Sequence, residues 1–352
     1  MNKAVIAMSG GVDSSVAAAL MLQQGFECIG ITLKLFSGGS RCCSLEDVND
    51  ARAAANHLGM PHYILNFTGP FQAEVIDRFV KIYQDGATPN PCIDCNRSIK
   101  FDALLLRTRQ IDFDCLVTGH YARIEKDKAS GRYLLKKSVD QKKDQSYVLY
   151  CLTQEQLGRT CFPLGPFTKN RVREIAAGLE LGNARKRESQ DICFVPDGDY
   201  GAFIERYTGR KAAEGDIIDL EGKILGRHRG LIRYTIGQRR GVGVACNRPL
   251  YVKAKSLARN TLTLGPEESL YSKTLFAGGL NLIACASIEK PLRVKVKTRY
   301  LQHEQWAVAE QTGPDTLRVD FDEAQRAITP GQAAVLYDGE TVVGGGTITA
   351  SS

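Results

Sequence analysis

The sequence predicts an α/β fold: a doubly wound, mostly parallel sheet followed by two small β domains, the last a β-barrel. Three observations predict it. Apolar runs alternate with helical patterns over about the first 120 residues. A turn rich in glycine and serine, Ser9–Ser15, joins the first run to a helix. From about residue 203, strand-length runs separated by glycine turns replace the helices. We therefore expect domains at 1–202, 203–272 and 273–352.

The first domain is expected to alternate strands with helices. Its predicted strands cover 4–8, 28–33, 63–67 and 115–118, and its predicted helices cover 16–22, 44–58 and 71–83. The predicted strands of the later domains cover 216–220, 251–254, 261–264, 293–300, 333–337 and 342–346. Parallel sheets bind ligands at the carboxyl ends of their strands, so Ser9–Ser15, Leu33 and Gly119 are expected along one rim.

The turn Ser9–Ser15 predicts an anion site. A strand, a glycine turn and a helix together aim backbone N–H groups and the positive end of the helix at an anion. Gly10 and Gly11 let the backbone approach that anion closely. Asp13 is expected either to cap the helix or to help hold Mg²⁺. An ordinary turn between a strand and a helix is the alternative, and the lysine of a G-x-x-x-x-G-K-[ST] loop is missing.

Composition favours a cytoplasmic protein with an anionic partner. The 352 residues carry a net charge of +7, which favours nucleic acid, although a solubilising surface is the alternative. No apolar run reaches the roughly 18–20 residues that span a bilayer, so no membrane partner is expected. Because Met1–Lys3 leads directly into the first strand, no signal peptide is expected. The eleven cysteines are then expected to be reduced, catalytic or metal-binding.

The stretch 88–101 contains the first candidate cysteines. Two prolines predict an extended loop, after which a helix is expected to start near Asn96 or Arg97. Cys95 would then lie at the helix N-terminus beside basic side chains, an environment that favours a thiolate. Cys92 and Cys95 have the spacing of half a zinc site, but no second C-x-x-C or H-x₃-H occurs in the sequence.

Cys193 is a further candidate because it follows a basic turn, residues 185–187. Taken alone, it is better explained as a buried structural cysteine, and its interest depends on closeness to Cys95. The adjacent Cys42 and Cys43 have no assigned role.

Two basic segments lie in the β domains. Residues 227–241 contain five arginines, and Arg293, Lys295, Lys297 and Arg299 alternate along one predicted strand. Basic strands with interleaved aromatic residues suit a phosphate backbone, and a solvated basic face is the alternative.

A set of motifs in order along the whole chain gives a family resemblance. The motifs are SGGVDSS (9–15), TPNPCxxCNxxIKF (88–101), TGHYAR (118–123), KDQSY (143–147), ESQDICF (188–194), HRGxxxYTIGQRRGVGV (228–244) and TPGQAAVLYDG (329–339). The chain resembles the tRNA-specific 2-thiouridylases, which belong to the PP-loop ATP pyrophosphatases. The resemblance implies ATP-dependent replacement of O2 by sulfur at the wobble uridine of tRNA, with release of AMP and pyrophosphate.

The resemblance also implies roles for individual residues. It assigns ATP contacts to Ala7, Met8, Ser9, Gly10, Gly11, Val12, Asp13, Ser14, Leu33 and Gly119. It assigns the nucleophile to Cys95 and a persulfide to Cys193. It places the target base against Asn90, Pro91 and Cys92, and the rest of the tRNA against His120, Lys143, Asp144, Gln145, Arg299, Tyr300 and Gln332. Mg²⁺ would accompany ATP, and a persulfide-bearing protein would donate sulfur.

One departure from the family pattern leaves the general acid or base unassigned. Some relatives carry aspartate where this chain has Cys92, and here the nearest aspartate is Asp94. If Cys92, Cys95 and Cys193 converge, they suit a [4Fe-4S] cluster with one open iron. Two rival functions are a PP-loop ligase acting on a small carboxylate or an amide donor, and a tRNA-binding protein without catalytic activity.

Overall fold

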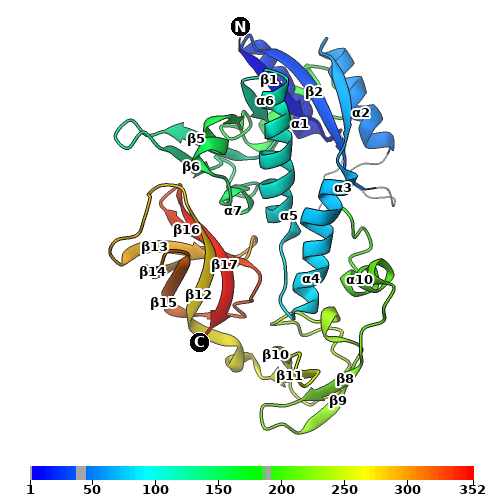
Figure 1. The fold of residues 1–352 in the computed structure, drawn as a ribbon, viewed down its shortest axis with the longest axis vertical. Coiled ribbons are helices and arrows are strands. Elements are labelled where there is room, and N and C mark those ends of the chain that lie inside the picture. Colours follow the sequence, from blue (N-terminus) through cyan, green and yellow to red (C-terminus); the bar gives the residue numbers. More distant parts are fainter. Residues whose placement is uncertain (1, 37–44, 185, 187–191) are drawn as a thin grey trace.

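The fold is described from a computed structural model covering residues 2–36, 45–184, 186 and 192–352. A parallel sheet with its helices lies at the N-terminal end, a β-barrel lies beside it, and a small mixed sheet lies at the opposite end (Figure 1). The predicted α/β fold class is confirmed. The adjacent Cys42 and Cys43 lie outside the described residues.

The N-terminal sheet is fully parallel, with the strand order β3-β2-β1-β4-β7. Its strands are β1 (Lys3–Ala7), β2 (Glu27–Lys34), β3 (His62–Asn66), β4 (Cys115–Val117) and β7 (Thr160–Cys161). Ala4, Val5 and Ile6 of β1 are fully buried, as expected for a central parallel strand covered on both faces. The first two strands end at the same edge, where Ala7 pairs with Ile31.

Helical segments cover this sheet and, in the view of Figure 1, extend below it. They are α1 (Val12–Gln23), α2 (Leu45–His57), α6 (Leu105–Gln110), α7 (Ser146–Leu149), α8 (Gln154–Gly158) and α9 (Lys169–Gly178). The predicted helix 71–83 is longer and contains a π-helical segment: α3 (Thr68–Phe71), η1 (Gln72–Asp77) and α4 (Arg78–Gln84) run consecutively. Helix α10 (Tyr200–Thr208) leads to the central β region.

The central region is a mixed sheet of order β10-β11-β8-β9. Its elements are β8 (Gly215–Ile218), β9 (Ile224–His228), η3 (Leu231–Arg233), β10 (Tyr251–Ser256), β11 (Thr261–Gly265) and η4 (Glu267–Leu270). Only β11 and β8 pair in parallel among its described strands. A separate apolar cluster that includes Ile217, Val252 and Leu262 gives this sheet its own core.

The C-terminal strands form an antiparallel barrel of order β12-β15-β14-β13-β16-β17, closed by pairing of β12 with β17. The strands are β12 (Tyr271–Leu282), β13 (Leu292–Lys297), β14 (Gln305–Gly313), β15 (Thr316–Arg326), β16 (Ala333–Asp338) and β17 (Thr341–Ser351). A hairpin of β5 (Ala122–Lys126) and β6 (Tyr133–Lys137) pairs with β17 through β6. A shared apolar core that includes Leu116, Tyr147 and Val335 therefore joins the N-terminal sheet to the barrel.

Within the described ranges, no helix combines the length and apolar character needed to cross a bilayer.

Candidate functional site

The turn after β1 forms an open cradle at the N-terminus of α1. Gly10 has a φ of 74°, and a Cβ at this position would lie 2.2 Å from the backbone oxygen of Asp47. Glycine is therefore required there. Gly11 occupies the N-cap position and has no side chain with which to cap the helix. The first-turn N–H groups of α1 are thus left for an anion, as the sequence predicts.

The serines of the turn hold its shape. The Ser14 hydroxyl donates to the backbone oxygen of Gly11 at 3.0 Å and accepts from the backbone N–H of Ser9 at 3.2 Å. Ser15 donates to the same Gly11 oxygen at 3.2 Å. Met8 is anchored to β2 because its N–H donates to Ile31 at 2.8 Å and its carbonyl accepts from the Thr32 hydroxyl at 2.8 Å.

Asp13 does not cap the helix. Its carboxylate instead accepts two hydrogen bonds from the Lys169 ammonium, at 2.7 and 2.8 Å, and one from the Tyr121 hydroxyl at 2.7 Å. The Lys169 side chain is 7 % exposed and that of Asp13 is 27 % exposed. The capping role expected for Asp13 was wrong, because Gly11 is the N-cap residue and two partners distant in sequence hold the carboxylate. The ion pair places the Lys169 ammonium next to the first turn of α1.

Gly119 and His120 lie on the other side of the cradle, after β4. A Cβ on Gly119 would lie 2.9 Å from the backbone of both Asp13 and Ser14, so the chain passes directly against the start of α1. The His120 ring is buried against Phe101 and Phe162, and its Nδ1 lies 2.7 Å from the Thr118 hydroxyl. Burial, with a smaller contribution from Lys100, lowers the pKa of His120 well below its usual value. Direct contact of this ring with RNA would require its surroundings to move.

The helix that carries the first cysteines starts earlier than predicted. Segments α5 (Pro91–Asp94) and η2 (Cys95–Leu104) continue into α6, with Asn90 at the N-cap and Pro91 at the first helical position. Proline fits that position because the first N–H groups of a helix have no internal partner. Cys95 consequently lies one turn into the helix, and Cys92 is the cysteine at its N-terminus.

One apolar cluster brings three of the candidate residues together. Leu33 at the end of β2, Cys95 on the helix, and Cys193 all pack against the buried cluster that contains Phe71, Phe79 and Phe194. Both cysteines are partly exposed, whereas Cys92 is exposed and is not among the residues of this cluster. Leu33 and these two thiols therefore contact the same buried cluster.

Asp94 points away from solvent on the same helix. Its carboxylate is nearly buried and lies 3.0 Å from the Arg78 guanidinium, with Arg97 at 3.9 Å. Burial raises the pKa of Asp94 above its ordinary value, and the two arginines oppose that shift. The Asp94 carboxylate is therefore part of the contacts between helices.

The loop before Cys92 is held by the barrel. The Gln332 amide donates to the carbonyl oxygens of Thr88 and Pro89 at 3.0 and 3.1 Å, and the Thr88 N–H donates to Pro330 at 2.9 Å. Gly331, with φ of 90°, passes so close that a Cβ would lie 2.8 Å from the Thr88 oxygen. The barrel thus fixes the loop that precedes both cysteines of the helix.

Arg299 fastens the barrel to the central region. Its Nη2 donates to the carbonyl of Ile236 at 3.0 Å, to that of Ala327 at 3.0 Å and to the Thr329 hydroxyl at 2.6 Å. Tyr300 packs beside Tyr147 with ring centroids 6.0 Å apart, and the Lys297 ammonium lies over both rings.

The KDQSY segment is mostly internal. Asp144 accepts from the Ser138 N–H at 2.9 Å and from the Ser146 hydroxyl at 2.6 Å, and burial raises its pKa. The Gln145 amide oxygen accepts from the Tyr121 N–H at 2.9 Å, which holds the TGHYAR turn. Lys143 is partly exposed.

Several partners of the cradle were missed by the sequence reasoning. Lys169, at the start of α9, pairs with Asp13. Asn183 donates to the Gly10 carbonyl at 3.1 Å and the Ser15 hydroxyl at 3.0 Å. The only local signal was Thr168, a typical N-cap residue that marks the start of α9. Spacing in sequence gives no information on such long-range contacts.

In the part of the chain that the structure describes, no group of three or more histidine, cysteine or carboxylate side chains is arranged to hold a metal ion. Cys92, Cys95 and Cys193 are all within that part.

Comparison with protein families agrees with this architecture. Residues 2–197 match a family described as the tRNA methyl transferase HUP domain, 201–266 its PRC-barrel domain, and 272–348 the aminomethyltransferase beta-barrel domain. The first domain therefore defines an ATP-using protein of the HUP, or PP-loop, class.

Full-length relatives identify the family within that class. The tRNA-specific 2-thiouridylase MnmA of Clostridioides difficile is 50% identical over 99% of this chain and 98% of that protein. The protein of the same name from Moorella thermoacetica is 50% identical over 98% of each chain. The chain belongs to the MnmA family of tRNA-specific 2-thiouridylases. A solved 4-thiouridine synthetase–RNA complex with bound ATP has 21% identity and a TM-score of 0.37, covering 55% of this chain and 44% of that one, too distant to place any residue.

Proposed function

We propose that this protein uses ATP to convert the wobble uridine of tRNA to 2-thiouridine. The observation that carries the proposal is that Leu33, near the carboxyl end of β2, and the thiols of Cys95 and Cys193 contact one apolar cluster. Adenylation followed by sulfur transfer requires a bound nucleotide and two thiols close together, and this shared contact supports such an arrangement. Family membership supports the same conclusion.

ATP is proposed to bind along the carboxyl edge of the parallel sheet. The backbone from Ala7 to Ser14 would surround the phosphates, and the positive end of α1 would stabilise the departing pyrophosphate. Leu33 would contact the adenine and Gly119 would let the chain approach the nucleotide. Lys169 joins this set because its ammonium lies against Asp13.

The chemistry activates a carbonyl oxygen that would otherwise leave as hydroxide. O2 of the uracil attacks the α-phosphorus of ATP, pyrophosphate departs and the N3 proton is released. The terminal sulfur of a Cys193 persulfide then forms a bond to C2, and AMP leaves with O2. The Cys95 thiolate attacks the Cys193 sulfur, so the persulfide bond breaks with its electron pair on the transferred sulfur, and N3 regains a proton. A Cys95–Cys193 disulfide remains, which an external dithiol must reduce.

A second order of events uses the same two thiols. Cys95 would first release hydrosulfide from the Cys193 persulfide, and hydrosulfide would then attack the adenylated C2. In both orders a persulfide-bearing donor protein must load Cys193, and the wobble base must leave the anticodon stack to enter the site.

The roles proposed for Cys95 and Cys193 require neither a protein-bound metal ion nor an iron–sulfur cluster. Mg²⁺ commonly takes most of its ligands from phosphates and water, so it would enter on ATP and supply charge neutralisation there, with Asp13 as the nearest carboxylate of the cradle. The described residues contain no three-ligand group, and Cys92 is exposed outside the cluster that Cys95 and Cys193 contact. This arrangement does not fit a [4Fe-4S] cluster.

The proposed tRNA residues divide into two groups. Asn90, Pro91, Cys92, Lys143 and Tyr300 would face the RNA. His120, Asp144, Gln145, Arg299 and Gln332 bind neighbouring protein groups and would act by holding the surrounding loops. We propose domain boundaries at 1–202, 203–272 and 273–352, with the first carrying the chemistry and the others supporting it.

The test is thiolation of tRNA transcripts in vitro with ATP, Mg²⁺ and a persulfide donor, quantifying 2-thiouridine and pyrophosphate. Cys95→Ser and Cys193→Ser are expected to release pyrophosphate on tRNA but to make no thiolated base. Cys28→Ser, which alters a buried cysteine of the sheet, is the matched control and is expected to do both. Thiolation at the wild-type rate by either of the first two variants would remove that cysteine from the mechanism.

A further inference from the structure

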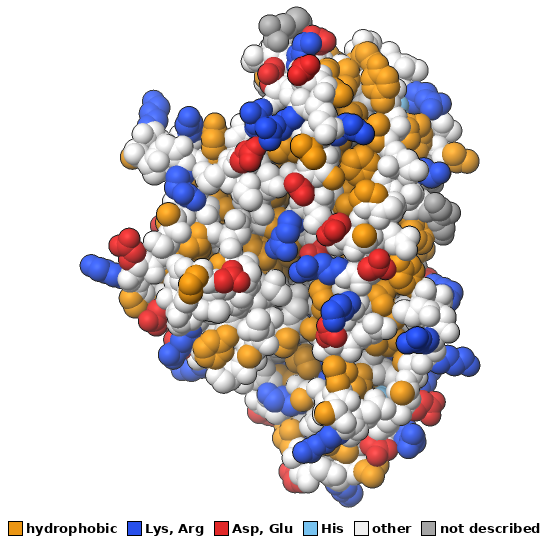
Figure 2. All heavy atoms as spheres, in the orientation of Figure 1, with side chains coloured by type: hydrophobic (Ala, Val, Ile, Leu, Met, Phe, Trp, Pro, Cys, Tyr) orange, Lys and Arg blue, Asp and Glu red, His pale blue; other side chains and the backbone are white. Residues whose placement is uncertain are grey.

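Positive charge is concentrated in the central region. Residues 222–266 contain no aspartate or glutamate. They contain ten basic residues: Lys223, Arg227, Arg229, Arg233, Arg239, Arg240, Arg248, Lys253, Lys255 and Arg259. The net charge of the whole chain is only +7, so the rest of the chain is slightly acidic. Figure 2 shows Lys and Arg side chains, with some Asp and Glu side chains among them, at the end of the molecule where Figure 1 places β8 to β11.

Some of these charges are satisfied within the protein. Arg233 pairs with Glu205 at 2.6 Å and Asp199 at 3.3 Å, and Arg227 pairs with Asp216 at 3.4 Å. Lys255 is internal and donates to the Tyr234 carbonyl at 3.0 Å, and burial lowers its pKa to about 8. These side chains serve the packing of the region itself.

Arg239, Arg240 and Arg248 lie together on one loop. All three are exposed on one loop, residues 239–250, and none has a carboxylate partner among the described residues. An arginine without a partner presents a planar fork of donors that matches a phosphate group. Three of them on one loop make a local site for a polyanion.

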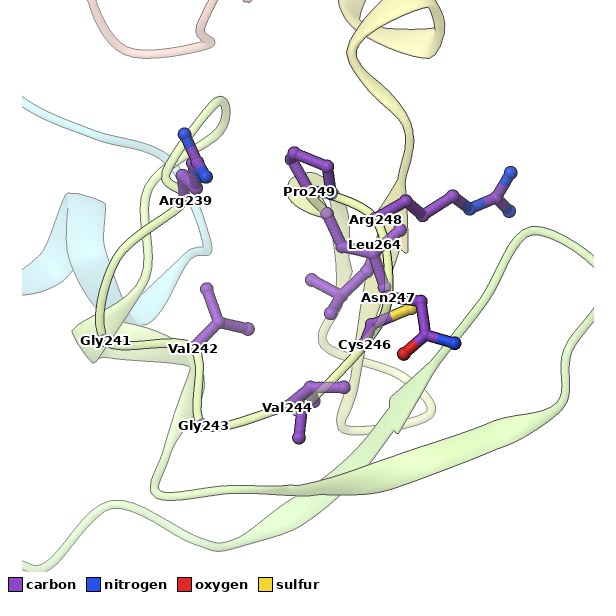
Figure 3. Close-up of a pocket in the computed structure, with 12 residues that line it drawn as sticks. Arg239, Gly241, Val242, Gly243, Val244, Cys246, Asn247, Arg248, Pro249 and Leu264 are labelled. Carbon is purple, nitrogen blue, oxygen red and sulfur yellow. The ribbon is translucent and has the colours of Figure 1, made fainter.

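Loop 239–250 is U-shaped, with two limbs (Figure 3). A hollow of about 630 Å³ separates them. Arg239 lies on one limb and Arg248 extends from the other, away from the hollow, while Val242, Val244 and Leu264 line the space between the limbs. Arginines next to an apolar surface suit a nucleic-acid strand, which presents bases as well as phosphates.

This region is fixed relative to the cysteine-bearing helix. Thr235 hydrogen-bonds the side chain of Tyr83 at the end of α4. A Cβ on Gly86 would lie 3.4 Å from Leu257. Arg299 ties the Ile236 carbonyl to the barrel. The arginine loop therefore has a defined position relative to the loop that precedes Cys92.

We propose that loop 239–250 is a docking site for the sugar–phosphate backbone of the tRNA, apart from the pocket for the wobble base. This inference rests on the proposed function, because tRNA is the polyanion that the reaction requires. Charge complementarity selects RNA, since the loop offers guanidinium groups on both limbs and the segment 222–266 offers no carboxylate. The site supplies affinity and orientation, and the chemistry stays at the two cysteines.

The experiment measures tRNA binding by fluorescence anisotropy over a range of salt concentrations. The variant carries Arg239→Gln, Arg240→Gln and Arg248→Gln, and its fold is checked by thermal unfolding. Each phosphate contact contributes about 0.7 to 0.9 to the slope of log K against log salt, so the slope is expected to fall by about 2 to 3. Arg227→Gln is the matched control because this exposed arginine of the same region has a carboxylate partner, and its slope is expected to stay that of wild type.

The outcomes separate this inference from the proposed function. With saturating tRNA, the triple variant is expected to thiolate at the wild-type kcat with a raised KM for tRNA. An unchanged salt slope in the triple variant overturns the docking site while leaving the thiolation proposal intact. An unchanged slope with impaired transfer from the sulfur donor would assign the loop to an acidic protein surface and also overturn it. Absence of tRNA binding by wild type would instead reject the proposed function.

Discussion

Gln332 offers the sharpest test of how the barrel supports the chemistry. Its amide makes two hydrogen bonds to the carbonyls of Thr88 and Pro89, which precede the helix carrying Cys92 and Cys95. Gln332→Ala removes both bonds. A typical hydrogen bond contributes about 0.5 to 1.5 kcal/mol net, so the loss is about 1 to 3 kcal/mol. If the whole of this free energy serves to hold the loop in its active conformation, kcat/KM decreases by about 5- to 150-fold.

The assay combines thiolation kinetics with the rate at which iodoacetamide alkylates Cys92 and Cys95 without tRNA. A loosened loop is expected to change thiol reactivity in the absence of RNA, whereas loss of an RNA contact alone leaves it unchanged. Gln311→Ala is the matched control, since Gln311 also makes two hydrogen bonds to backbone, at 3.0 and 3.3 Å, but within the barrel region. If Gln332→Ala behaves like this control in both measurements, the support by the barrel is refuted.

Three further predictions concern the cradle. Lys169→Met leaves the Asp13 carboxylate without its cation. Because Asp13 is about a quarter exposed, we expect the free energy of unfolding in urea to fall by about 2 to 4 kcal/mol and the KM for ATP to rise. A decrease below about 0.5 kcal/mol would contradict the pairing. Gly119→Ala is expected to lose about 1 to 3 kcal/mol and weaken ATP binding because its Cβ meets the backbone of α1, whereas Gly178→Ala, which meets no atom within 4 Å, is expected to lose nothing. Burial lowers the pKa of His120, so below about pH 6.5 the unfolded chain binds a proton that the folded chain excludes. The free energy of unfolding should therefore fall as the pH drops below about 6.5, by up to about 1.4 kcal/mol per pH unit. In unfolding curves measured from about pH 7 to 5, His120→Asn should remove this component of the pH dependence.

The helix that carries Cys92 and Cys95 shows where a sequence pattern gave a wrong prediction. Two prolines in 88–91 predicted an extended loop up to about Asn96, and the structure instead begins the helix at Pro91. Proline has two compatible roles, since it fixes φ both in extended loops and at the first position of a helix. The choice depends on what surrounds the segment. Here the barrel holds the preceding Thr88 and Pro89, and the helix follows at once.

The sequence by itself determined the local features. Period-two and helical patterns predicted the sheet, its flanking helices and the later β regions, because side-chain direction repeats with backbone geometry. The turn Ser9–Ser15 predicted an anion site, because glycines between a strand and a helix leave backbone N–H groups at the start of the helix. The motifs, taken together, indicated the family.

Only the tertiary structure decided which distant residues meet. Lys169 reaches Asp13 across 156 positions, and Gln332 reaches Thr88 across 244. The same holds for the meeting of Cys95 and Cys193 at one cluster, and for the burial of His120 and Asp144, which the motifs alone suggested would face RNA. Such contacts depend on how complete sheets and barrels pack against each other. That packing is set by the fit of whole apolar faces, and no spacing within a motif records it.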